Sequence, residues 1–168
     1  VLDRKQKTFA HLFTEQGYAT CIAGKWQLGR EKDAPQHFGF DESCLWQHFR
    51  LARATVKGSK QKVDTRYPNP RLEVNGKEMD YDNGEYGPEI VSDYICDFIE
   101  RKKSEPFLVY YPMILPHSPF PPTPDSKNAN CTDNTKNFID MVQYIDKIIG
   151  KIDLQLKKSG VRDNTLLI

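Results

Sequence analysis

Two residues of this sequence, Lys25 and His117, are candidates for binding an anion. Lys25 is preceded by Gly24, which lets the backbone turn sharply, and an ammonium group pairs with sulfate or phosphate oxygens. His117 lies in 112–125, which contains six prolines. Proline fixes φ, so such a loop can hold one side chain in place without secondary structure. The alternative interpretation of Lys25 is a surface lysine after a strand. The alternative interpretation of His117 is a loop histidine that caps a nearby carbonyl.

The N-terminal part of the chain predicts a helix followed by a strand that leads to Lys25. Apolar residues at helical spacing predict a helix over 3–16, with Asp3 as its N-cap and Gly17 as its stop. The small, aromatic and β-branched residues of 18–24 predict a buried parallel strand. Ligands bind at the carboxyl ends of parallel strands, so we expect Lys25 at the ligand edge of a sheet.

The rest of the chain continues this alternation of helices and strands. An apolar stripe predicts a helix over 88–101, and a compact apolar run predicts a strand over 107–111. A second long stripe predicts a helix over 136–158, and a further strand is expected to begin at 164–168. Together these elements predict an α/β fold with a parallel-rich sheet flanked by helices.

Residues of about 43–87 have a looser pattern and predict a loop and hairpin excursion at the ligand edge. The segment 57–62 is rich in Gly, Ser and Lys and predicts a loop. The pair Asn75-Gly76 is the strongest two-residue hairpin signal in the chain.

Composition excludes several classes of function. The chain has 168 residues, with 24 Lys and Arg against 23 Asp and Glu, so no charge pattern indicates a nucleic-acid partner. The mean hydropathy is −0.66 and no apolar run approaches the length needed to span a membrane, so no membrane partner is expected. The four cysteines form no C-x-x-C pair, which argues against a zinc knuckle.

Several motifs, in order along nearly the whole chain, resemble those of the type I sulfatase (arylsulfatase) family of the alkaline-phosphatase-like superfamily. They are G-Y-A-T-C-I-A-G-K-W-Q-L-G at 17–29, H-F-G-F-D-E at 37–42, P-F-L-V-Y-Y-P at 106–112, L-P-H-S-P-F at 115–120, P-T-P-D-S at 122–126, M-V-Q-Y-I-D at 141–146 and G-V-R-D-N-T at 160–165. The resemblance implies an alkaline-phosphatase-like fold and a sulfuric ester hydrolase that cleaves sulfate monoesters of sulfated sugars or aryl sulfates.

The resemblance also assigns roles to individual residues. Lys25 matches the lysine that contacts the sulfate, and His117 matches the histidine that contacts the sulfate and helps the leaving group depart. Gln27 occupies the position of the family's other histidine, near the formylglycine hydroxyl. An amide forms hydrogen bonds but does not exchange a proton near neutral pH, so efficient turnover is in question while anion binding is not.

Other parts of the family's machinery do not occur in this sequence. The resemblance implies calcium and a formylglycine in the full-length parent, but the C-x-P-S-R nucleophile motif and the tandem aspartate ligands of calcium are absent. The S-D-N-G calcium ligands would follow Ile168. We therefore expect residues 1–168 to be an internal part of one sulfatase catalytic domain, inactive alone, whose own residues support no cofactor or metal site.

Two other functions remain open. The first is a non-catalytic, sulfated-glycan-binding pseudoenzyme, and the second is a phosphate or phosphonate ester hydrolase of the same superfamily. The expected partner is a sulfated small molecule or glycan. The resemblance implies a periplasmic, secreted or lysosomal location.

Overall fold

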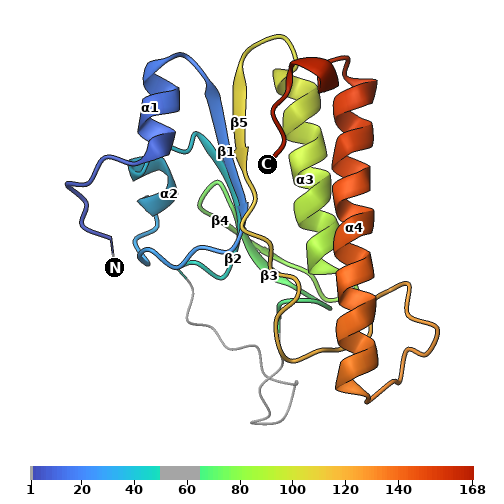
Figure 1. Ribbon diagram of the computed structural model, residues 1–168. Helices are drawn as coiled ribbons and strands as arrows, with labels where there is room; N and C mark the ends of the chain where they lie inside the picture. Colours follow the sequence, from blue (N-terminus) through green and yellow to red (C-terminus); the bar gives the residue numbers. More distant parts are fainter. Residues whose placement is uncertain (1, 50–64) are drawn as a thin grey trace.

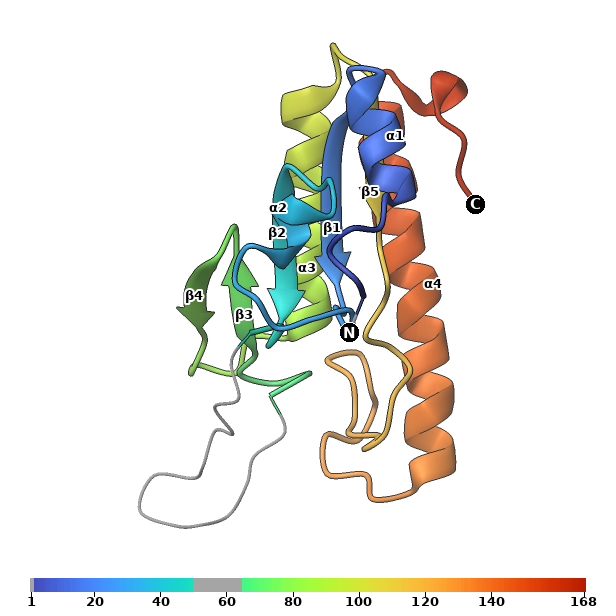
Figure 2. The same cartoon turned by 90° about the vertical axis from the view of Figure 1, so that its left-hand side faces the viewer.

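The computed structural model describes residues 2–49 and 65–168, and in them helices cover both faces of one mixed sheet (Figure 1). The strands are β1 (Ala19–Gly24), β2 (Glu42–Trp46), β3 (Arg71–Val74), β4 (Lys77–Asp80) and β5 (Phe107–Tyr110), in the sheet order β4-β3-β2-β1-β5. The helices are α1 (Phe9–Glu15), α2 (Ala34–His37), α3 (Gly87–Lys102) and α4 (Asn134–Lys158), with a short 3-10 helix, η1, at Arg162–Asn164. Figure 2 shows α1 and α2 in front of the sheet, with α3 and α4 behind it. The predicted α/β class is confirmed.

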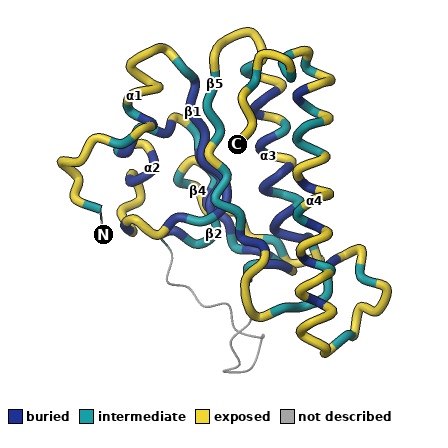
Figure 3. The backbone as a smooth tube through the Cα atoms, viewed as in Figure 1, coloured by how far each residue is buried: buried dark blue, intermediate teal, exposed yellow. Residues whose placement is uncertain are grey.

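Strand β1 is the centre of the parallel part of the sheet. It pairs in parallel with β2, where Cys21 lies opposite Glu42, and with β5, where Ala19 lies opposite Phe107. All of its residues are buried, as the dark run through the middle of Figure 3 shows. Parallel strands end at the same edge of a sheet, so the segments that follow β1, β2 and β5 all leave the sheet at one edge.

Each face of the sheet has its own apolar core. Ile22 and Leu45 point toward α1 and α2, while Cys21, Ala23 and Cys44 point toward α3. The face toward α3 and α4 also buries Leu72, Val91, Ile95, Phe98, Ile99 and Leu156. Full burial of one such aliphatic or aromatic side chain contributes about 1.5–3 kcal/mol relative to exposure, so these two layers hold β1 in place.

Helix α1 starts later than the sequence predicted. Thr8, not Asp3, is its N-cap, and the N–H of Thr8 donates to Nδ1 of His11 at 3.0 Å. Asp3 instead forms a local turn in which its carboxylate accepts from the N–H of Lys5 at 3.0 Å. Aspartate side chains often compete with a helix in this way, which explains why the predicted start at residue 3 is wrong. The predicted stop is confirmed, because Gly17 follows the helix with φ +79°.

The predicted hairpin at Asn75 and Gly76 is confirmed, and it adds two antiparallel strands to the sheet. Both residues have positive φ, +49° and +74°, and they join β3 to β4. Strand β2, which begins within the motif at 37–42, is a sheet strand that sequence reasoning did not identify. The predicted loop at 57–62 lies outside the described residues.

The last residues do not form the predicted strand. Arg162–Asn164 is a 3-10 helix, and Leu166 and Leu167 are exposed and pair with no described strand. The β-branched and leucine-rich pattern alone cannot form a strand, because a strand needs a neighbour to accept its hydrogen bonds. Within the described part of the chain, no helix combines the length and the apolar character needed to cross a membrane.

Candidate active site

The turn after β1 is fixed by a close approach to the segment that follows β5. The N–H of Lys25 donates to the carbonyl oxygen of Pro112 at 2.8 Å. Gly24 has φ +123°, and a Cβ added to it would lie 2.3 Å from the same oxygen. Only glycine tolerates both the backbone conformation and the contact, so Gly24 is required where Lys25 leaves the sheet.

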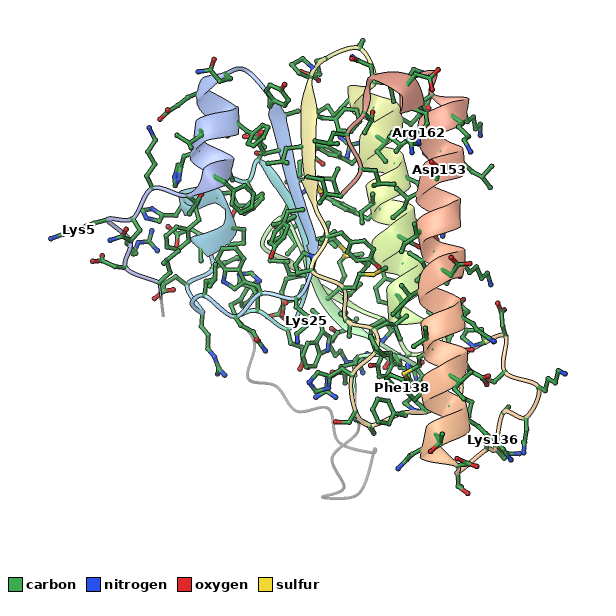
Figure 4. All side chains as sticks on the ribbon, in the orientation of Figure 1. Lys5, Lys25, Lys136, Phe138, Asp153 and Arg162 are labelled. Atoms are coloured by element: carbon green, nitrogen blue, oxygen red, sulfur yellow. The ribbon has the colours of Figure 1, made fainter. Side chains whose placement is uncertain are left out.

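Trp26 anchors the turn while the side chains on either side of it stay accessible. Its indole is buried against Phe38 and Phe40 and donates to the carbonyl of Gly29 at 3.0 Å. Lys25 is half-buried at the lower end of β1 in Figure 4, and Gln27 is exposed. Within the described residues, neither Nζ of Lys25 nor the amide of Gln27 has a hydrogen-bond or ion-pair partner. Both groups are therefore free to contact a ligand.

The imidazole of His117 is oriented by its own loop. Nδ1 lies 2.5 Å from the carbonyl oxygen of Ser118. A carbonyl only accepts, so Nδ1 carries the proton and Nε2 has the lone pair of the neutral ring. The side chain caps a nearby carbonyl, as in the alternative interpretation, yet Nε2 has no partner among the described residues. In the protonated ring, Nε2 can donate.

One pocket brings two of the three candidate residues together. A pocket of about 350 Å³ is lined by Lys25 and Gln27, and much of its wall is aromatic, including Trp26 and Phe40. His117 is not among its lining residues. The common edge of β1 and β5 places the Lys25 turn and the His117 loop on the same end of the sheet, but joint contact with one anion stays a prediction.

Sequence reasoning missed a buried pair at the carboxyl end of β2. The side chains of His48 and Glu73 are fully buried, and the N–H of His48 donates to Oε2 of Glu73 at 2.8 Å. The ring of His48 contacts that of Trp26 with centroids 6.5 Å apart. A glutamate in a short strand usually faces solvent, so no local pattern reveals this buried pair next to Trp26.

The calcium that the resemblance implies is expected in the full-length parent, and the described residues alone form no metal site. Among residues 2–49 and 65–168, no group of three or more His, Cys, Asp or Glu side chains is arranged to hold a metal ion. Cys21 and Cys44 are buried in the sheet, and burial raises the pKa of the Cys44 thiol to about 12. Such thiols stay protonated and serve in packing.

Curated relatives of the chain carry sulfatase names. It is 32% identical over 120 residues to N-acetylglucosamine-6-O-sulfatase of Bacteroides thetaiotaomicron, and the aligned region covers 71% of this chain and 18% of that protein. It is 27% identical over 172 residues to N-acetylgalactosamine-6-sulfatase of Homo sapiens, covering 96% of this chain and 31% of that protein. The chain thus spans a third or less of the length of these relatives.

Solved structures share the fold. The crystal structure of Ps i-CgsB in complex with k-i-k-neocarrahexaose superposes with a TM-score of 0.71 at 22% identity, covering 94% of this chain and 38% of that chain. This similarity shows the alkaline-phosphatase-like fold that the resemblance implied. A family model described as Sulfatase matches residues 1–168. The chain therefore belongs to the sulfatase family.

Proposed function

We propose that the complete protein is a sulfuric ester hydrolase and that Lys25 and His117 contact the sulfate group of its substrate. The observation that supports this most is the pair of unpartnered nitrogens at one edge of the sheet. Nζ of Lys25 and Nε2 of His117 lack partners among the described residues, and they follow the adjacent parallel strands β1 and β5. Cationic donors placed at that edge suit an anionic ligand.

The chemistry of the two residues follows from the charge changes in the reaction. A sulfate monoester is negatively charged and repels an oxygen nucleophile, and its leaving oxygen gains charge as the S–O bond breaks. The ammonium of Lys25 offsets the charge on the sulfate oxygens. The protonated imidazole of His117 donates from Nε2 to the leaving oxygen, as a general acid.

Gln27 favours a second candidate function, a sulfated-glycan-binding protein without turnover. Its amide can hold a sulfate or hydroxyl group by hydrogen bonds, but it cannot shuttle a proton where the family has a histidine. A phosphate or phosphonate ester hydrolase is the third candidate, since the fold alone does not fix the substrate.

Sulfated sugars are the substrate class that we propose. Two curated relatives are named as N-acetylglucosamine-6-O-sulfatase and N-acetylgalactosamine-6-sulfatase, and a structural neighbour was solved with k-i-k-neocarrahexaose. These names describe the relatives and support a sulfated glycan as the partner of this protein.

The test compares hydrolysis of 4-nitrophenyl sulfate and 4-nitrophenyl phosphate by the complete protein. We expect the sulfate ester to be the better substrate, and Lys25→Met and His117→Ala each to lower kcat/KM about 100-fold or more. Lys5→Met is the matched control, because Lys5 is exposed and lies far from Lys25 in Figure 4. Hydrolysis of the phosphate ester alone would favour the third candidate. Binding of a sulfated sugar without hydrolysis would favour the second.

A further inference from the structure

The hydroxyl of Tyr67 holds both main-chain polar groups of His117. It donates to the carbonyl oxygen of His117 at 2.6 Å and accepts from the N–H of His117 at 3.0 Å, across 50 residues of sequence. A phenol has one O–H donor and can accept as well, so one side chain satisfies both groups at once. Tyr67 is fully buried, whereas His117 is exposed.

This contact supplies what the loop at 112–125 lacks. The loop belongs to no strand or helix, and the prolines on either side of His117, Pro116 and Pro119, have no N–H to donate. The main chain of the loop at His117 is therefore held by a side chain from another segment, Tyr67. Arg66 adds a second contact, because its guanidinium donates to the carbonyl oxygen of Ser118.

Tyr67 is itself fixed to the start of α3. Its carbonyl oxygen accepts from the N–H of Gly87 at 2.7 Å, and its ring stacks on that of Tyr86 with centroids 6.1 Å apart. A Cβ added to Gly87 would lie 2.4 Å from the carbonyl oxygen of Arg66, so this segment packs tightly on the helix. Rigid contacts therefore lead from α3 through Tyr67 to His117.

We propose that Tyr67 is a positioning residue that sets the main chain of His117 and thereby the direction of Nε2. The inference rests on the proposed role of His117 as the sulfate contact and proton donor. With the N–H and C=O of His117 held by one hydroxyl, and Nδ1 bonded to Ser118, the imidazole has few ways left to move. Small displacements of a catalytic group are costly: a misplacement of about 1 Å can lower a rate about 100-fold.

The test is Tyr67→Phe in the complete protein, with Tyr86→Phe as the matched control. Tyr86 belongs to the same aromatic cluster, but its buried hydroxyl has no hydrogen-bond partner in the described part of the chain. With 4-nitrophenyl sulfate, we expect Tyr67→Phe to lower kcat about 10- to 100-fold while KM changes less than about threefold. Tyr86→Phe should stay within about twofold of the wild type in both constants. Thermal unfolding of both variants checks that each is folded.

A double-mutant cycle with His117→Ala separates positioning from a general structural effect. If Tyr67 acts through His117, adding Tyr67→Phe to His117→Ala should change kcat less than about twofold. The inference is overturned if the two substitutions lower kcat independently, or if Tyr67→Phe behaves like Tyr86→Phe while His117→Ala is strongly impaired. That last result leaves the proposed function intact.

Failure of the proposed function has a different signature. If the wild type hydrolyses no sulfate ester, the affinity for inorganic sulfate, measured by calorimetry, becomes the readout. Weaker binding by Tyr67→Phe and His117→Ala, with Tyr86→Phe unchanged, supports the positioning role. Equal affinity of all four proteins overturns it.

Discussion

The backbone N–H of Lys25 donates to the carbonyl oxygen of Pro112 at 2.8 Å, and this bond joins the two segments that carry the candidate sulfate contacts. It adds one more main-chain hydrogen bond to the pairing of β1 with β5, just past the last residues of both strands. The Lys25 turn and the first residue of the His117 loop are therefore held together. This junction fixes where the Lys25 turn lies relative to the start of the His117 loop.

The junction predicts that Gly24→Ala is destabilising. The added Cβ would lie 2.3 Å from the oxygen of Pro112, at a residue with φ +123°. Both the overlap and the backbone conformation oppose the change, so we expect the free energy of unfolding to fall by about 2 kcal/mol or more. Denaturant unfolding of the complete protein measures it.

Gly150→Ala is the control for this prediction. Gly150 lies in the exposed part of α4, and a Cβ added there meets no atom within 4 Å. Alanine should stabilise the helix by about 0.5–1 kcal/mol. If Gly24→Ala unfolds with the same midpoint denaturant concentration as the wild type, that result would contradict the close contact at the turn.

The ion pair between Glu42 and Arg101 predicts a dependence of stability on pH. The guanidinium donates to both carboxylate oxygens, at 2.9 and 2.7 Å, and these hydrogen bonds hold the pKa of Glu42 below its ordinary value of 4.5, against the opposing effect of desolvation. A lowered pKa means that the stabilisation is complete above pH 4.5 and is lost as pH falls through the folded-state pKa.

Glu42→Gln tests this pair. Because the Arg101 side chain is 42% exposed, solvent screens the interaction, and we expect a loss of about 1 kcal/mol at pH 7. The difference from the wild type should shrink as the pH is lowered below 4.5. Asp97→Asn removes the other, more exposed partner of Arg101 and should cost less than about 0.5 kcal/mol. If the effect of Glu42→Gln on the free energy of unfolding does not change with pH, the ion pair is not the source of the stabilisation.

Gln27→His tests whether the glutamine limits turnover. Gln27 lines the same pocket as Lys25, so a histidine there would stand beside the proposed sulfate site. We expect kcat for 4-nitrophenyl sulfate to rise about 10-fold, with a new pH dependence near the ordinary pKa of histidine. Gln36→His, on the exposed surface of α2, is the matched control and should leave kcat unchanged. Unchanged kcat in Gln27→His would show that proton exchange at residue 27 does not limit the reaction.

The elements that the sequence predicted well are those with a local signal. Gly17 ends α1, Pro88 lies in the first turn of α3, and Asn75-Gly76 forms the hairpin. Each depends on backbone preferences within a few residues. Strand β2 has no such signal, because its five residues include Glu42 and Ser43 and become a strand only by pairing with β1 and β3.

The candidate site shows the same division. Lys25 and Gln27 are two residues apart, and the pocket contains both. The hydroxyl of Tyr67 reaches His117 from 50 residues away. Glu73, in strand β3 of the hairpin, is buried beside His48, which follows strand β2. Such contacts arise from the tertiary fold, and no spacing along the chain indicates them.

The most direct test of the account is the crystal structure of the complete protein with a sulfated sugar or inorganic sulfate in the site. We predict that Nζ of Lys25 and Nε2 of His117 each lie within about 3.2 Å of oxygens of the same sulfate group. A sulfate held by neither nitrogen, or a separation of the two nitrogens beyond about 8 Å, too wide for hydrogen bonds to one sulfate, would contradict the account.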